Sequence, residues 1–456
     1  MRVTLIHPCI GRRAEMRKPI RTWQLEPLWA AALAGATPAD VDLVFHDDRF
    51  EPIPYDRPTD LVGISAETYT ARRGYQIASE YRRRHVPVVI GGFHATLCPE
   101  DAGEFAEAVV AGPAQAVWPE VIDDARHGRL ERLYRADGAV SMAGLRYERR
   151  VLAGKRYLPL RLVEFGRGCR QTCEFCAVQS ASDRVYSHRP VDEVIAEVAA
   201  LKASDAGSGL LFFVDDNLVS DPETIKEFLR RLIPLRVQWV GQASINGAHD
   251  PEMLELFVRS GCRCVLIGFE SLDPEALRQM HKPINEARGG VTEAVRALRR
   301  HRVPVYGTFV FGWDSDTPAG CRRTARYAIE QGFLLAAFAQ LLPFPGTPLY
   351  ARLEGEGRLR YRRWWLDDEY GGYNTVAYEP RCMSAENLRR ECLAARCAFF
   401  SWRSLARRSL EPSQRQSFAS WRDYWTVNLL HRSELGLRDG HPLGDVSWPG
   451  PWARVG

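Results

Sequence analysis

Residues 168–176 read Gly-Cys-Arg-Gln-Thr-Cys-Glu-Phe-Cys, and this stretch is the most informative part of the chain. It brings together Cys169, Cys173 and Cys176, and the nearest residue that could serve as a fourth ligand, His188, lies beyond a polar loop. Structural zinc sites and fully ligated iron–sulfur clusters take four protein ligands. Three thiolates therefore favour an iron–sulfur cluster with one iron open to a small chelating molecule. The alternatives are an incomplete zinc site and a chance grouping.

The surroundings of the cysteines favour a catalytic site. Residues 161–165 are predicted to form a strand, Gly166 and Gly168 end it, and a helix is predicted over 190–203. The cysteine loop then follows the carboxyl end of a strand, where βα barrels carry their chemistry.

Strands and helices alternate through the middle of the chain. The predicted strands cover 161–165, 210–214, 237–243, 264–269, 303–310 and 335–341, and the predicted helices cover 190–203, 221–233, 250–260, 273–280, 287–301 and 317–331. These strands are continuous apolar runs, which is typical of buried parallel strands.

The first part of the chain alternates in the same way. The predicted strands cover 2–7, 41–46, 60–65, 86–90 and 107–111, and the predicted helices cover 25–36, 70–85, 99–105 and 116–127. This pattern predicts a doubly wound, Rossmann-like α/β domain over residues 1–130, with its ligand site at the carboxyl ends of the strands. Ser65, Gly91, Gly92 and Gly112 fall there, and glycines let a ligand approach the backbone closely.

The cysteine spacing, C-x-x-x-C-x-x-C with the aromatic Phe175 before the last cysteine, resembles the radical S-adenosylmethionine (radical SAM) superfamily. Residues 213–217 (Phe-Val-Asp-Asp-Asn), 268–271 (Gly-Phe-Glu-Ser) and 343–350 (Pro-Phe-Pro-Gly-Thr-Pro-Leu-Tyr) resemble its cobalamin-dependent branch, which carries a B12-binding domain and includes hopanoid methylase-like members. The resemblance implies a partial (β/α)6 barrel over residues 158–345. It also implies a [4Fe–4S] cluster on the three cysteines, with SAM on the open iron.

Polar residues at the carboxyl ends of the barrel strands are the expected SAM contacts. SAM carries an ammonium, a carboxylate, a ribose diol and an adenine, so carboxylates, amides and close backbone should bind it. The predicted set is Phe175, Asp215, Asp216, Gln242, Ser244, Glu270, Ser271 and Gly312. For the two aspartates, the alternative is capping of the helix that starts near Asp221. Glu270 is expected to point into the barrel mouth, where an unpaired carboxylate would be costly.

Residues 1–130 resemble the cobalamin-binding domain of this branch, best over the segment from Gly91 to Thr96. The implied cobalamin contacts are Ser65, Glu67, Gly91, Gly92, His94 and Gly112. Two positions depart from the D-x-H-x-x-G and S-x-L patterns of domains that ligate cobalt through histidine: Phe50 replaces the histidine and Glu67 replaces the leucine. A histidine ligand to cobalt is therefore not expected. The alternative is an α/β module that binds no cobalamin.

Residues 131–157 are predicted to be a connector and residues 346–456 a helical C-terminal region. This region is rich in Trp, Tyr and Arg, which suits the core of a helical lid or a surface for a bulky apolar or aromatic substrate. Its irregularly spaced cysteines, Cys382, Cys392 and Cys397, favour buried thiols over a second cluster.

Composition argues against several other classes of protein. The formal net charge of +4 in 456 residues is too weak to argue for a nucleic-acid partner. No apolar run reaches the roughly 18 residues of a membrane span, and the first residues read as a strand rather than a signal peptide. The 11 cysteines show no secreted-type pairing, and a labile cluster needs a reducing compartment. We predict a cytoplasmic protein without a membrane span.

The resemblance implies an enzyme that cleaves SAM reductively to a 5′-deoxyadenosyl radical, with electrons from an external donor such as flavodoxin or ferredoxin. With cobalamin bound, the expected outcome is transfer of a methyl group to an unactivated carbon of a small-molecule or lipid-like substrate. The alternative is a radical SAM cyclisation, rearrangement or oxidation without methyl transfer, in which the first domain binds no cobalamin. A regulatory protein without turnover is the third hypothesis.

Overall fold

The N-terminal sheet is built from short apolar strands that all run parallel. The computed structural model describes residues 1–13, 19–136, 140–204 and 209–455. The sheet contains β1 (Arg2–His7), β3 (Asp42–Asp47), β4 (Leu61–Ser65), β5 (Val88–Gly91), β6 (Ala108–Ala111) and β7 (Leu133–Arg135), with helices α1 (Leu28–Ala36), α2 (Thr68–Arg82), α3 (Phe93–Leu97), α4 (Pro99–Gly103) and α5 (Trp118–Arg126). The strand order is β3-β1-β4-β5-β6-β7. The direction of winding reverses between β1 and β4, so the switch point of a doubly wound sheet lies beside Ser65.

The five strands predicted in this region are confirmed, each within about two residues of its predicted ends. Of the sheet strands and α-helices given above, β7 and α3 were not predicted. Strand β7 has only three residues, and Tyr134 alone among them is buried, so it has no apolar run. Helix α3 has five residues and follows directly on the turn at Gly92, too short for a helical period.

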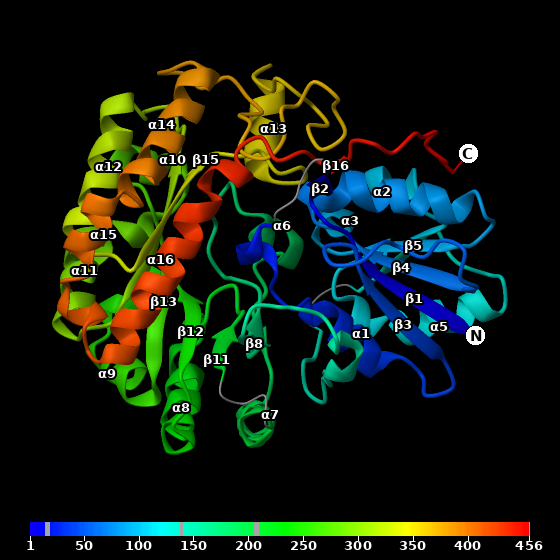
Figure 1. Ribbon diagram of the computed structural model, residues 1–456, viewed down its shortest axis with the longest axis horizontal. Coiled ribbons are helices and arrows are strands. Elements are labelled where there is room, and N and C mark those ends of the chain that lie inside the picture. The colour runs from blue at the N-terminus through cyan, green and yellow to red at the C-terminus, as the bar shows by residue number, and fades with distance from the viewer. Residues whose placement is uncertain (14–18, 137–139, 205–208, 456) are drawn as a thin grey trace.

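The second sheet is also parallel and lies beside the first (Figure 1). Its strands, in spatial order, are β8 (Leu160–Val163), β11 (Leu210–Phe213), β12 (Trp239–Ala243), β13 (Cys262–Glu270), β14 (Val305–Phe311) and β15 (Leu335–Gln340). The intervening helices are α7 (Val191–Ala203), α8 (Pro222–Leu232), α9 (Pro251–Ser260), α10 (Pro274–Gln279), α11 (Gly290–Arg300) and α12 (Pro318–Glu330). Strands β8 and β15 form the two edges, so the sheet is an open, partial barrel. The α/β prediction is confirmed.

The two faces of the barrel sheet are packed differently. On β14, Val305 and Phe309 are buried, and Phe309 stacks on Phe338 of the neighbouring strand β15 with ring centroids 5.6 Å apart. The alternate residues Tyr306, Thr308 and Val310 face the inside and are only half-buried. Barrel interiors are usually filled by layers of large side chains. This barrel therefore keeps accessible space on its inner face.

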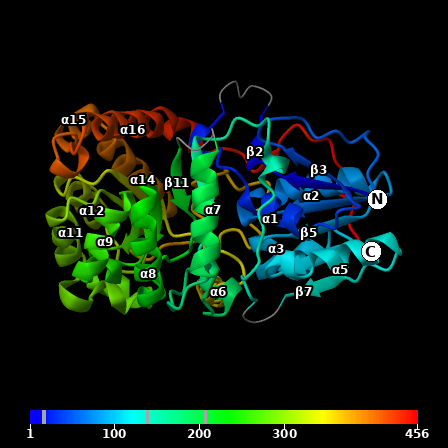
Figure 2. The same cartoon turned by 90° about the horizontal axis from the view of Figure 1, so that it is seen from below.

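The C-terminal region packs on both sheets rather than on the barrel alone. Helices α13 (Pro348–Gly355), α14 (Ala385–Phe399), α15 (Trp402–Arg408) and α16 (Phe418–Arg438) lie on the barrel side, and the tail then crosses to α2 (Figures 1 and 2). Strand β16 (Gly444–Asp445) pairs with β2 (Gly11–Arg12). Nε1 of Trp448 donates to Glu80 on α2 at 2.8 Å. Chain segments at opposite ends of the sequence thus fix the two sheets together.

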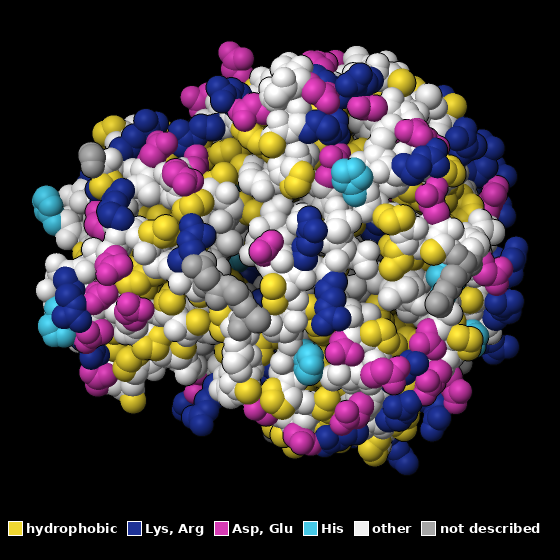
Figure 3. Space-filling view, turned by 180° about the vertical axis from the view of Figure 1, so that it is seen from behind, with side chains coloured by type: hydrophobic (Ala, Val, Ile, Leu, Met, Phe, Trp, Pro, Cys, Tyr) yellow, Lys and Arg dark blue, Asp and Glu magenta, His cyan; other side chains and the backbone are white. Residues whose placement is uncertain are grey.

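The surface carries both signs of charge. The face in Figure 3 has acidic and basic side chains intermingled, in keeping with 57 acidic and 61 basic residues in the chain. Among the described residues, no helix combines the length and the hydrophobicity needed to span a bilayer.

Candidate functional site

The cysteine loop is held by short elements at the end of β8. Strand β9 (Gly166–Arg167) pairs with β10 (Ser187–His188), and α6 (Ala177–Ser182) follows the loop. Gly168 has φ +87°, and a Cβ there would lie 2.0 Å from the carbonyl oxygen of Val185, so only glycine fits. The ring of His188, the nearest residue considered as a fourth ligand, stacks on Phe165, and its Nδ1 lies 3.0 Å from the Arg189 carbonyl oxygen.

The three thiols fit a [4Fe–4S] cluster with one open iron. All three are free, Cys173 is buried, and Cys169 and Cys176 are half-buried. Burial raises the pKa of Cys173 to about 12, and a negative charge on either neighbouring cysteine would raise it further, so the three sulfurs lie close together. In the described part of the chain, no three His, Cys, Asp or Glu side chains converge on a single metal ion. A cubane places each thiolate on a different iron, so its ligands are spread around the cluster rather than pointed at one atom.

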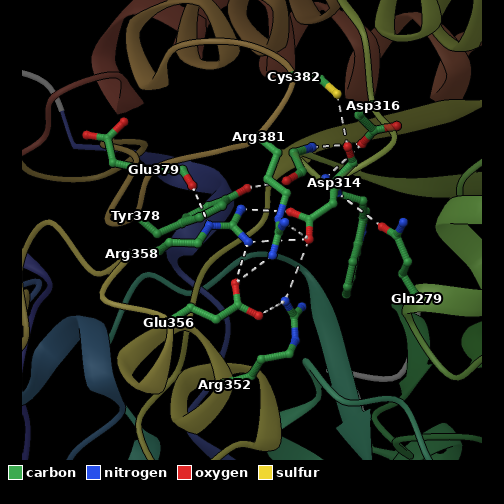
Figure 4. Close-up of polar contacts among 12 residues, drawn as sticks. Gln279, Asp314, Asp316, Arg352, Glu356, Arg358, Tyr378, Glu379, Arg381 and Cys382 are labelled. Atoms are coloured by element: carbon green, nitrogen blue, oxygen red, sulfur yellow. Dashed lines mark hydrogen bonds and ion pairs between the residues drawn. The ribbon is translucent and has the colours of Figure 1, made fainter.

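The loop is anchored by an ion-pair network on its outer side. Glu174, between the second and third cysteines, pairs with Arg352 of α13 at 2.6 Å. Figure 4 shows Arg352, Arg358 and Arg381 converging on Asp314 and Glu356. Glu174 is buried, so its pairing fixes the loop to the C-terminal region.

Asp215 and Asp216 support the cysteine loop through its backbone. Asp215 accepts hydrogen bonds from the amides of Phe165 at 2.9 Å and Gly166 at 2.7 Å. Asp216 accepts from the amide of Gly168 at 2.7 Å. Neither caps α8, because Asp221 accepts the hydrogen bond of that N-terminus itself. Burial raises the pKa of both aspartates.

The end of the next strand, β12, is tied to Asp216 and Asn217, and Asn217 belongs to the motif at 213–217 but is not among the predicted SAM contacts. Gln242 Nε2 donates to the carbonyl oxygen of Asp216 at 2.8 Å. Ser244 donates its backbone N–H and its hydroxyl to Asn217 Oδ1, at 2.9 and 3.0 Å. Asn217 Nδ2 in turn lies 3.9 Å from the Cys169 sulfur. The signal for Asn217 was present, since it directly follows the aspartate pair.

Glu270 has a partner that the sequence did not reveal. Lys282 Nζ lies 2.7 Å from Glu270 Oε1 and 2.9 Å from the carbonyl oxygen of Gly268, and both charged side chains are buried. A negative charge on Glu270 or on Cys173 raises the pKa of Lys282, while burial lowers it. The lysine therefore brings a positive charge close to the cysteines. Its position, in the loop after α10, carries no local pattern that would identify it.

The remaining predicted SAM residues are Phe175 in the cysteine loop, Ser271 after β13 and Gly312 after β14, and none of them lines the cavity described below. Gly312 has φ +112°, and its carbonyl oxygen accepts the hydroxyl of Tyr378 at 2.5 Å. The ring of Phe175 meets Trp313 edge-on at 5.8 Å. Ser271 Oγ accepts the amide of Asp273 at 3.0 Å.

A cavity of about 780 Å³ lies between the two sheets. It is at the large end of the range for ligand pockets. The N-terminal side contributes five of the predicted cobalamin residues, and the barrel contributes residues that flank and support the cysteine loop: Ser65, Glu67, Gly91, Gly92 and Gly112 on one side, and Glu164, Arg167, Gly168 and Asp216 on the other. The structure thus brings together the strand ends of both sheets.

Glycine is required at two points of the N-terminal wall. Gly92 has φ +99°, and a Cβ there would lie 2.6 Å from the Ala66 carbonyl oxygen. Gly112 has φ +89°, and a Cβ there would lie 2.5 Å from the Ala136 carbonyl oxygen. Glu67 is open to the cavity that it lines, and the protein that surrounds this cavity shields the carboxyl group from bulk water and so raises its pKa.

Two positions discussed for cobalamin lie away from the cavity lining. His94 is fully buried, with Nε2 3.0 Å from Asp101 and Nδ1 3.3 Å from Thr68, so the structure does not bring it to the cavity. Phe50, in the place of the cobalt-ligating histidine, packs edge-on against Tyr157 at 5.3 Å.

The sequence reasoning missed a charged group in the barrel wall of the cavity. Arg167 donates to both oxygens of Glu164 at 2.8 Å, and the hydroxyl of Tyr147 donates to Glu164 at 2.5 Å. The sequence feature that could have indicated this pair is a glutamate and an arginine on either side of a strand end, just before the cysteines.

Comparison with known proteins agrees with this geometry. Residues 163–328 match the radical SAM superfamily. The bacteriochlorophyllide d C-12(1)-methyltransferase of Chlorobaculum tepidum is 30% identical over 355 residues, which cover 76% of this chain and 76% of that protein. The hopanoid C-2 methylase of Rhodopseudomonas palustris is 26% identical and covers 61% of this chain and 55% of that protein.

A solved structure has the same fold. The radical S-adenosylmethionine methyltransferase TsrM of Kitasatospora setae, with cobalamin and a [4Fe–4S] cluster bound, superposes with a TM-score of 0.64 at 18% identity, over 95% of this chain and 99% of that one. The sequence relationship to the C. tepidum enzyme extends over three quarters of both chains. This chain therefore belongs to the radical SAM enzymes, in their cobalamin-dependent branch.

Proposed function

We propose that this enzyme methylates an unactivated carbon of a small molecule, using SAM, a [4Fe–4S] cluster and cobalamin. The observation that carries the proposal is the shared cavity, with glycine-containing strand ends on one wall and, on the other, the residues that flank and support the cysteine loop, among them Gly168 and Asp216. A cofactor held by the first wall would lie beside a molecule bound at the open iron. The naming of the C. tepidum relative as a bacteriochlorophyllide methyltransferase supports methyl transfer, and a tetrapyrrole-like substrate.

The chain's own residues would hold and isolate these groups. When bound, the cluster supplies the electron that splits SAM, and cobalamin supplies a transferable methyl group. Cys169, Cys173 and Cys176 would ligate the cluster, while Asp215 and Asp216 hold the backbone that presents them. We infer that SAM is bound by residues at the carboxyl ends of the barrel strands and in the cysteine loop: Phe175, Asp216, Gln242, Ser244, Glu270, Ser271 and Gly312.

Each part of the chain then has a task. Residues 1–130 would bind cobalamin through Ser65, Glu67, Gly91, Gly92 and Gly112, and residues 158–345 would bind the cluster and SAM. Residues 131–157 connect the two domains, and residues 346–456 close the barrel and fix its position. We propose an external one-electron donor of the flavodoxin or ferredoxin type, and a cytoplasmic location, because 11 free cysteines and an exposed iron need reducing conditions.

The test is anaerobic reconstitution with iron, sulfide and cobalamin, followed by desalting and incubation with SAM, a reductant and bacteriochlorophyllide d as the probe substrate. We expect retained cobalamin, with a spectrum that lacks a protein imidazole ligand to cobalt, and formation of S-adenosylhomocysteine together with 5′-deoxyadenosine. Protein that retains no cobalamin but still makes 5′-deoxyadenosine would support radical SAM chemistry without methyl transfer. Tight cofactor binding without any SAM cleavage would support a regulatory role.

A further inference from the structure

Three tyrosines with free hydroxyls meet where the three parts of the chain join. Tyr69 lies at the start of α2, Tyr306 on the inner face of β14, and Tyr373 in the segment before α14. All three side chains are half-buried, and the rings of Tyr69 and Tyr373 lie 4.8 Å apart. Within the described ranges, none of their hydroxyl groups has a hydrogen-bond partner in the protein, and none is sealed from accessible space. Buried tyrosine hydroxyls usually find a partner, so these three are available to a bound molecule.

A positive charge without a carboxylate partner lies beside two of these tyrosines. Arg396 of α14 donates from Nε to the carbonyl oxygen of Phe338 at 2.8 Å and from Nη2 to Oε1 of Gln340 at 3.2 Å. In the part of the chain that the structure describes, no carboxylate lies within ion-pair distance of it. By contrast, Arg438 nearby is paired with Glu434 at 3.0 Å. A half-buried guanidinium satisfied only by neutral acceptors favours a site for an anion.

The charge of Arg396 acts directly on the tyrosines. Burial raises the pKa of Tyr69 and of Tyr373, and the nearby guanidinium offsets part of that rise. Both phenols therefore remain protonated at neutral pH and can donate hydrogen bonds to the same anion. Burial also raises the pKa of Tyr306 to about 12, so it too remains a donor.

This group lies between the barrel interior and the cofactor cavity. Tyr306 belongs to the inner row of β14, whose neighbours on the sheet leave accessible space: Ala339 on β15 is exposed although it lies within the barrel. On the other side, the charge of Glu67, which lines the cavity between the sheets, reaches Tyr373. Trp23 packs on Tyr373 with ring centroids 5.0 Å apart, so flat aromatic surfaces border the site.

We infer that Arg396, Tyr69 and Tyr373 bind a carboxylate of the substrate, and that the substrate is a planar conjugated acid whose ring system extends into the barrel past Tyr306. This inference rests on the proposed function, because it takes the space between the barrel and the cofactor cavity as the substrate site. Aromatic walls bind a flat apolar ring, and the guanidinium with two phenols fixes its orientation through the acid group.

Binding of protoporphyrin IX, a planar diacid, compared with its dimethyl ester tests the inference on cluster-reconstituted protein without SAM or cobalamin, by quenching of tryptophan fluorescence. We expect the acid to bind about tenfold more tightly than the ester, because a charge-assisted hydrogen bond is lost on esterification. Arg396→Gln should lower the affinity for the acid about tenfold and leave the affinity for the ester unchanged. Arg396→Lys should restore part of the difference between the two affinities. Tyr69→Phe and Tyr373→Phe should each weaken the acid about threefold.

The matched control is Arg390→Gln, an exposed arginine on the same helix, which should change neither affinity. Equal affinity of the wild-type protein for acid and ester would overturn the inference. The same holds if Arg396→Gln lowers the affinity for both compounds equally, or if the wild-type protein binds neither. The outcome is separable from that of the proposed function. If the protein discriminates between acid and ester but forms no S-adenosylhomocysteine, only the proposed methylation is contradicted. If it methylates bacteriochlorophyllide d but does not discriminate between acid and ester, only this inference is contradicted.

Discussion

The two walls of the central cavity are built on opposite principles. On the barrel side, chemistry is carried by side chains in and behind the wall: Asp216, which lines the cavity, holds the backbone of Gly168, and Lys282 pairs with Glu270 close to the cysteines. On the N-terminal wall, space is made by the absence of side chains at Gly92 and Gly112. Removing a group should therefore damage the first wall, whereas adding atoms should damage the second.

The largest effect should follow removal of a thiolate from the cysteine loop on the barrel side. Cys173→Ala is expected to abolish the [4Fe–4S] chromophore and all SAM cleavage, because two remaining thiolates leave two irons without a protein ligand. Iron content, visible absorption and 5′-deoxyadenosine formation measure this loss. Cys392→Ala, which removes a buried thiol on α14, is the matched control and should retain about four irons per chain. A Cys173→Ala protein that still forms 5′-deoxyadenosine would contradict the cluster assignment.

Addition of atoms to the N-terminal wall should have the next largest effect. At Gly91 a Cβ would meet only Val110, at 3.6 Å, so Gly91→Val should fold and project methyl groups into the cavity lining. We expect cobalamin affinity to fall about tenfold or more, because inserting extra atoms into a packed contact costs about 1–3 kcal/mol. SAM cleavage should be retained. Gly436→Val, on α16 with open space around its Cβ, is the control. Unchanged cobalamin retention after desalting would show that this wall does not contact the cofactor.

The neighbouring glycine should behave differently. Gly92→Ala places a Cβ against the backbone of Ala66 and forces a non-glycine residue into a positive φ. The expected result is a loss of about 1–3 kcal/mol in the free energy of unfolding. Urea denaturation of Gly91→Ala and Gly92→Ala compares the two positions directly. Equal stability of the two variants would contradict the requirement for glycine at position 92.

The difference between the walls also decided what the sequence could reveal. The sequence predicts the cysteines, the aspartate pair and Glu270 as site residues because they follow apolar strands in a recognisable order. The sequence does not point to Lys282, and it places Asn217 at a strand end without indicating its role, because these roles depend on tertiary contacts with Glu270 and Ser244. His94 is predicted as a cobalamin contact because it belongs to the segment from Gly91 to Thr96 that resembles the cobalamin-binding domain, yet its ring is buried in the core, with Nε2 3.0 Å from an oxygen of Asp101. Sequence position locates a loop, but it does not say which way a side chain points.

A buried carboxylate at the end of β14 should make stability depend on pH. Burial raises the pKa of Asp316 to about 6, above its usual 3.8. The folded state thus binds this proton more tightly than the unfolded state, so the stabilisation is greatest below pH 4 and is lost as the pH rises through 6. Asp316→Asn should keep the two backbone hydrogen bonds from Gly312 and Trp313, which reach a single oxygen.

We therefore expect the Asn variant to be more stable than the wild type at pH 8, by about 1–3 kcal/mol, and similar near pH 4. Urea denaturation at the two pH values measures this, with the exposed Asp192→Asn as control. A difference of the same size at both pH values would contradict burial as its cause.

The smallest effect should come from the contact between Asn217 and the cluster. Its Nδ2 approaches the Cys169 sulfur at 3.9 Å, and a hydrogen bond to a thiolate stabilises the reduced, more negative cluster. Asn217→Asp keeps an oxygen for Ser244 but replaces the donor with an acceptor, so the midpoint potential of the cluster should become more negative. Redox titration followed by electron paramagnetic resonance measures this shift.

Ser244→Ala removes a hydroxyl on the other side of Asn217 and leaves the contact with sulfur intact, so it should shift the potential much less. Equal shifts in the two variants would mean that Asn217 acts by holding the strand ends together rather than through the sulfur. Cobalamin retention should be unchanged in both, because the cavity lining on the N-terminal side is untouched.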